Sequence, residues 1–221
     1  EPLNLRYSRF GFEARDALLT VLEAADPDHV AAAQLKARAT ARMAPGALLE
    51  LEPAETAMVA LRVIQEFETF WYADQDARRL ARALLRLARQ PGPGSTPASF
   101  ALGLEARETL VRMLRPDMRP SALQPKEEGV RKREAARFRA VMDEFVTEPD
   151  PAVREAVQAV LVHAGFVPVS TEAALDELFS LATGDGVPMD APRTVKRATR
   201  RYAITILSIL GGLAGSSAPE D

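Results

Sequence analysis

Residues 49–61 read Leu49-Glu-Leu51-Glu52-Pro53-Ala-Glu55-Thr-Ala57-Met58-Val-Ala-Leu61, and this stretch decides how the chain folds. Two apolar residues flank a polar one, a residue that can cap a helix follows, and the remainder carries apolar residues at helical spacing. Glu52 is the expected cap, Pro53 suits the first helical position, and Glu55 completes an arrangement similar to a capping box. The pattern predicts a short extended segment that leads directly into a capped helix.

The same pattern recurs in the same register at residues 10–22 and 102–114, and a looser copy begins at residue 167. The apolar pairs of the two closer copies are Phe10 with Phe12, and Leu102 with Leu104. The sequence around Phe67 also resembles the sequence around Phe145. We infer an internal duplication from these similarities. The alternative interpretation is convergence, in which unrelated junctions between strands and helices have the same sequence pattern.

The composition favours helices. The chain has 221 residues, 47% of them hydrophobic and 27% charged, as in an ordinary soluble globular protein. Alanine, leucine and arginine dominate, and residues that favour strands are sparse. We therefore predict a mainly α-helical bundle of about eight or nine helices in two related halves, with minor pairing of short β-strands. The halves are residues 1–90 and 99–221, and a linker rich in proline and glycine joins them at 91–98.

Motifs for catalysis and for cofactors are missing from the sequence. The chain has no cysteine and two histidines, and neither histidine belongs to a metal-binding motif. His29 follows an Asp-Pro-Asp turn, and His163 lies in the last turn of a predicted helix, where the helix dipole alone favours it. No glycine-rich loop for phosphate opens any helix. We predict that the protein is not an enzyme and has no catalytic, cofactor-binding or metal-binding residue.

Two basic features could bind the phosphates of a nucleic acid. The first, which we call the basic collar, lies at residues 193–201 without an acid among them and comprises Arg193, Lys196, Arg197, Arg200 and Arg201. The second is a helix expected at residues 126–139, which contains the consecutive cations Arg131, Lys132 and Arg133 together with Glu127, Glu128 and Glu134. The alternative interpretation is that both features are solvated helix faces with ion pairs along the helix.

The last predicted helix is apolar on more than one side, so it must be enclosed on more than one side. It is either the central helix of its own fold or a helix that docks into a second subunit. The interface residues that we predict for a symmetric dimer are Tyr202, Ile206, Ile209, Leu210 and Leu213. The apolar run at 203–214 is shorter than the roughly 20 residues that cross a bilayer, so we expect no membrane span.

These observations predict a non-catalytic helical interaction or scaffold protein, a homodimer that acts through contacts with another protein. Nucleic-acid binding through residues 193–201 and 126–139 is the alternative. The formal net charge of −3 favours the first function. No cysteine and no signal-peptide pattern stand in this sequence, and we expect a cytoplasmic location.

Overall fold

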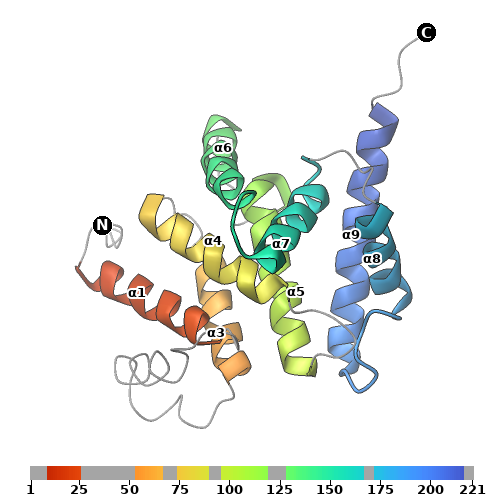
Figure 1. The fold of residues 1–221 in the computed structure, drawn as a ribbon, viewed down its shortest axis with the longest axis horizontal. Coiled ribbons are helices and arrows are strands. Elements are labelled where there is room, and N and C mark those ends of the chain that lie inside the picture. Colours follow the sequence, from red (N-terminus) through yellow and green to blue (C-terminus); the bar gives the residue numbers. More distant parts are fainter. Residues whose placement is uncertain are drawn as a thin grey trace.

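The structure, a computed structural model, describes residues 9–25, 53–66, 74–89, 96–118, 128–166 and 172–216. These residues form eight α-helices and one short 3-10 helix, without a β-strand among them, which confirms a mainly helical fold (Figure 1). The elements are α1 (Arg9–Ala24), α3 (Pro53–Glu66), α4 (Asp74–Ala88), α5 (Pro97–Leu114), η2 (Pro116–Met118), α6 (Glu128–Phe145), α7 (Pro151–His163), α8 (Glu172–Thr183) and α9 (Arg193–Ser216).

Two of the predicted extended segments are helical, so the strand pairing predicted for them is wrong. Phe10 and Phe12 lie within α1, and Leu102 and Leu104 lie within α5. Helix α5 begins much earlier than Glu105, because Thr96 accepts a hydrogen bond from the backbone of Ser99 and caps the helix there. The spacing of the apolar residues at 102 and 104 resembles that of a strand because α5 is buried on several sides. Leu102 and Leu104 are both buried although they point in nearly opposite directions from the helix.

The second copy of the pattern folds as predicted where the structure describes it, since α3 begins at Pro53. The apolar pairs at residues 49 and 51 and at residues 167 and 169 lie outside the described residues. The same holds for residues 91–95 of the predicted linker, whereas residues 97 and 98 already form the first turn of α5.

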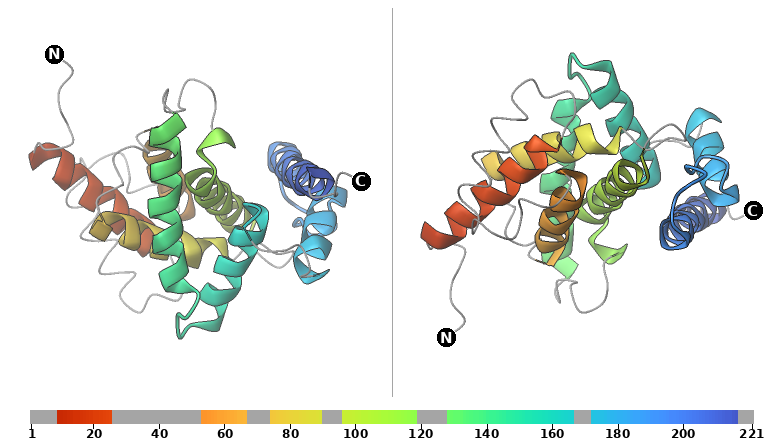
Figure 2. Two further views of the ribbon diagram at one scale, coloured as in Figure 1. Left: turned by 90° about the horizontal axis from the view of Figure 1, so that it is seen from above. Right: turned by 90° about the horizontal axis from the view of Figure 1, so that it is seen from below.

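Helix α5 runs through the middle of the molecule and contacts α3, α4, α6, α7 and α9 (Figures 1 and 2). The largest side chains of the core come from both predicted halves and are fully buried together, among them Leu22, Leu61, Leu84, Phe100 and Phe138. The two halves therefore share one hydrophobic core.

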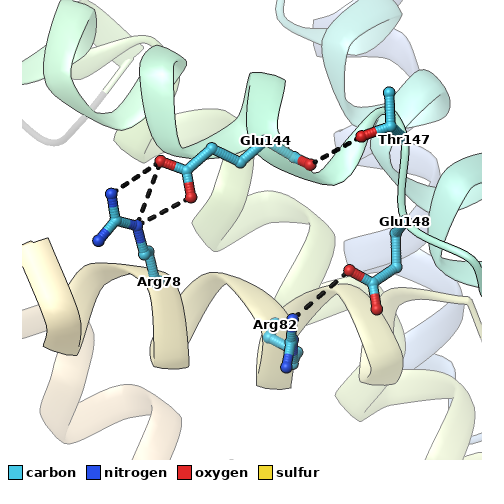
Figure 3. Close-up of polar contacts among 5 residues, drawn as sticks. All are labelled: Arg78, Arg82, Glu144, Thr147 and Glu148. Carbon is cyan, nitrogen blue, oxygen red and sulfur yellow. Dashed lines mark hydrogen bonds and ion pairs between the residues drawn. The ribbon is translucent and has the colours of Figure 1, made fainter.

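The arginine face of α4 meets acidic residues where α6 ends (Figure 3). The guanidinium group of Arg78 forms a two-pronged ion pair with Glu144, with Nε to Oε2 at 2.8 Å and Nη2 to Oε1 at 2.9 Å. One turn further along α4, Arg82 Nη2 lies 3.5 Å from Glu148 Oε2. This face thus joins residues of the first half to residues of the second.

The α8–α9 hairpin (residues 172–216) lies at one end of the molecule in every view (Figures 1 and 2). Helix α8 packs along α9, and α9 contacts the bundle mainly through α5. Helix α8 ends at Thr183, and the φ of 101° at the following Gly184 favours glycine. The backbone N–H groups of Gly184 and Gly186 both donate to the carbonyl of Ser180, at 3.0 and 3.2 Å, and so close the helix end.

Candidate functional site

The basic collar occupies the first two turns of α9, and all five of its side chains are exposed. Within the described part of the chain, none of these cations forms an ion pair with a carboxylate. Lys196 donates from Nζ to the carbonyl of Met189 at 2.8 Å. The other four share one side of the helix, facing away from the residues of α9 that are buried. The structure therefore places the predicted collar on an outward surface, without an ion-pair partner among the described residues.

The position of the collar adds to its positive potential. No acid stands in the first turn of α9, and the N-terminal end of a helix already carries the positive end of the helix dipole. Cations at this end oppose the stability of the helix by a few tenths of a kcal/mol each, or about 1 kcal/mol at most. Charge and dipole together make this end of α9 attractive to a negatively charged group.

Apolar side chains are exposed beside the collar. Ile204, one turn beyond Arg200 on the same side of α9, exposes 48% of its surface. Met189, whose carbonyl accepts the hydrogen bond from Lys196, exposes 96% of its surface. The outward surface of the hairpin thus offers both cations and apolar contact area.

One collar residue also influences the bundle. Arg201 lies close enough to Glu108 of α5 for its charge to lower the pKa of that carboxyl. Burial outweighs this effect, and the pKa of Glu108 is raised above its ordinary value. Arg112, one turn further along α5, forms the ion pair with Glu108.

The second basic feature is remote from the collar. Lys132 and Arg133 are exposed on α6, which packs against α4, α5 and α7. Figures 1 and 2 show α6 and α9 in different parts of the molecule. Lys132 pairs with Glu128 at 2.6 Å, so part of its charge is neutralised along its own helix. Arg131 lies in α6, and its side chain is outside the described residues.

Most of the predicted interface residues of α9 pack against other residues of their own chain. Tyr202, Ile206 and Leu210 are buried in the hydrophobic core, and Ile209 is half-buried against it. Leu213 belongs to α9, but its side chain is outside the described residues. In this conformation Tyr202, Ile206 and Leu210 pack inside their own chain. A second copy could contact these three residues only if α9 separated from the rest of its chain.

A cluster of polar side chains, three of them buried and one half-buried, lies where the hairpin meets the bundle, and sequence reasoning missed it. We call Arg107, His163, Glu177 and Tyr202 the polar junction. The hydroxyl of Tyr202 lies 2.8 Å from Nδ1 of His163, and the two rings meet edge to face. Arg107 Nε donates to the carbonyl of Ala88 at the end of α4, at 2.8 Å, and its Nη1 pairs with the carboxylate of Glu177 on α8.

His163 is uncharged at neutral pH in this environment. Its side chain has no exposed surface, and burial together with the charge of Arg107 lowers its pKa to about 3. Burial raises the pKa of the Tyr202 hydroxyl. Among the described residues, Nε2 of His163 has no hydrogen-bond partner. Both rings are shielded from solvent, so the arrangement is that of a contact between helices.

The described residues contain no group of three or more acidic or histidine side chains that could hold a metal ion. In the same part of the chain, no helix combines the length and the apolar character needed to cross a membrane. No protein-family model matches the chain, and neither a curated protein nor a solved structure is significantly similar to it. The proposals that follow therefore rest on the residues and their geometry.

Proposed function

We propose that this protein is a non-catalytic interaction protein that binds an acidic segment of another protein through the outward face of α9. The observation that carries the proposal is the collar, because its five exposed cations have no ion-pair partner among the described residues. Elsewhere in the described structure, arginines such as Arg78, Arg107 and Arg112 are paired with carboxylates. An acidic partner would supply the missing counter-charges.

Electrostatic complementarity of this kind mainly accelerates association and selects the partner. Arginine is also enriched among the residues that dominate protein interfaces. The exposed side chain of Ile204 would add an apolar contact on the same side of the helix. An acidic segment that also carries apolar side chains is thus the best match for this surface.

Nucleic-acid binding is the alternative, since phosphates would satisfy the same cations. Two observations favour a protein partner. The basic residues of α6 do not extend the collar into a longer track, and the chain as a whole is slightly acidic. An exposed apolar side chain such as Ile204 also contributes more to an interface with a protein than to contacts with phosphates.

Fluorescence anisotropy with labelled probes tests the proposal. The probes are an acidic peptide of glutamate and leucine, a polyglutamate peptide, a short DNA duplex and a single-stranded RNA. We expect the glutamate–leucine peptide to bind best, and we expect a variant with Arg197→Glu, Arg200→Glu and Arg201→Glu to lose at least about tenfold in affinity. Lys132→Glu with Arg133→Glu on α6 is the control, and it should leave peptide binding unchanged.

The collar variant should remain folded, because all three exchanged side chains are exposed. Circular dichroism checks this point. Tighter binding of DNA or RNA, lost in the collar variant, would favour the alternative function. Failure of every probe at low salt would refute both functions.

We also infer that the two halves descend from a duplication. In support, α1 contacts both α3 and α4, as α5 contacts both α6 and α7, and the repeated pattern aligns α1 with α5. The homodimer predicted from the sequence is proposed only in a form in which α9 is exchanged, because three of its predicted interface residues are buried within the chain.

A further inference from the structure

The α8–α9 hairpin depends on the bundle less than the other helices depend on one another. Most of the packing of α8 is with α9, and α5 is the bundle helix that α9 contacts most. The hairpin lies beyond one side of the bundle in both views of Figure 2. An element with few contacts to its neighbours can open at a smaller free-energy cost than the global unfolding of the chain.

The polar junction supplies the specific links across this boundary. Glu177 of α8 pairs with Arg107 of α5, and Tyr202 of α9 contacts His163 of α7 through its hydroxyl. Buried polar pairs contribute little net stability, because each group regains water when the pair separates. The polar junction therefore fixes the position of the hairpin through contacts that water can replace, beside the apolar contacts of Ile206 and Leu210.

His163 makes this docking sensitive to protons. The groups that face it are the guanidinium of Arg107, which Glu177 pairs, and the hydroxyl of Tyr202. Glu108 also acts on Tyr202 through its charge. An imidazolium would stand near the positive Arg107, and the proton on its Nε2 would have no acceptor among the described residues. In the open state water would solvate the charged ring.

We propose that the α8–α9 hairpin is a detachable arm, docked on the bundle while His163 is neutral and released when that imidazole takes up a proton. The inference concerns the inward side of α9 and is independent of binding by the collar. Release would expose the apolar surface of Tyr202, Ile206 and Leu210, which is buried in the docked state.

The direction of the pH effect follows from the two protonation states. The docked imidazole binds a proton only near pH 3, whereas a solvated histidine does so near its ordinary pKa of 6.5. The open state therefore holds more protons between these values, so acid favours it. Each pH unit below about 6.5 shifts the ratio of open to docked hairpin by up to about tenfold. Above that pH the ratio of open to docked hairpin is insensitive to protons from this group.

Energy transfer between two dyes tests the proposal directly. The chain contains no cysteine, so Ala136→Cys on α6 and Ser208→Cys on α9, both at exposed positions, provide two labelling sites. We expect the transfer efficiency to fall as the pH drops below about 6.5, while the helical signal in circular dichroism is retained. In the labelled chain that also carries His163→Gln, which is uncharged at every pH, this step should disappear.

Hydrogen exchange on the unlabelled wild-type protein provides a test that needs no variant. After correction for the intrinsic effect of pH, amides of α9 should lose protection in acid before amides of α4 and α5. Constant transfer across the pH range, an unchanged pH step in the His163→Gln chain, or equal loss of protection in α9 and α4 would each overturn the proposal.

Discussion

The hydroxyl of Tyr202 lies 2.8 Å from Nδ1 of His163, and this contact connects the middle of α9 to the last turn of α7. The two residues are 39 positions apart in the sequence, and both side chains are buried. Each ring therefore satisfies a polar atom of the other that water cannot reach. A solvated histidine changes its charge near neutral pH. The contact therefore connects the position of the hairpin to the protonation of His163.

Tyr202→Phe should destabilise the protein. The variant keeps the buried ring and leaves Nδ1 of His163 without the hydroxyl, so we expect the free energy of unfolding to fall by about 1–3 kcal/mol. Urea denaturation measures the change. Thr205→Val, which removes an exposed hydroxyl from the same helix, is the control and should change stability by about 0.5 kcal/mol or less. Equal losses in both variants would contradict a special role for the Tyr202 hydroxyl.

Stability should decrease in mild acid because of His163. Its pKa is lowered to about 3 in the folded protein, so the unfolded chain binds the extra proton between that value and about 6.5. In this window the free energy of unfolding should fall with decreasing pH, by up to about 1.4 kcal/mol per unit from this group. Urea titrations of wild type and His163→Gln at several pH values isolate the effect as their difference. Parallel curves for the two proteins would show that His163 does not titrate as described.

Arg107 and Glu177 should be energetically coupled. Removing either partner leaves the other partly buried without its counter-charge, so Arg107→Met alone should cost about 2–4 kcal/mol. The double variant Arg107→Met with Glu177→Gln should cost less than the sum of the single changes, by about 1 kcal/mol or more. The matched cycle at Arg78 and Glu144, where both side chains are about half exposed, should give only about 0.2–1 kcal/mol. A coupling at Arg107 no larger than at Arg78 would contradict this difference.

Local signals in the sequence predicted the helical features that depend on a few neighbouring residues. The start of α3 follows from Pro53 and its flanking acids, and the collar follows from a run of cations without an acid. The start predicted for α5, at Glu105, was wrong because two capping signals compete in this part of the sequence. Thr96 followed by Pro97 is the stronger signal, and Glu105 is left in the middle of the helix.

The polar junction could not be predicted in the same way. Arg107 and Glu177 are 70 positions apart, and neither stands out from the other charged residues of its predicted helix. Their pairing depends on how α5 and α8 cross, which periodicity does not determine. The sequence predicted that His163 lies at a helix end. It could not predict the contact with Tyr202, because this contact depends on how the hairpin docks on the bundle.

A cycle of acid and neutral pH at high protein concentration should produce dimers that exchange the α8–α9 hairpin. A hairpin released in acid can dock on the bundle of a second copy when the pH returns to neutral, because the contacts available there are identical. This process would bury Tyr202, Ile206 and Leu210 again, in agreement with the interface predicted from the sequence. Light scattering should then detect a species of twice the chain mass of 24.0 kDa. The His163→Gln chain, whose hairpin should stay docked, is the control. Absence of the dimer after the cycle, or equal amounts of it in wild type and control, would rule out exchange driven by His163.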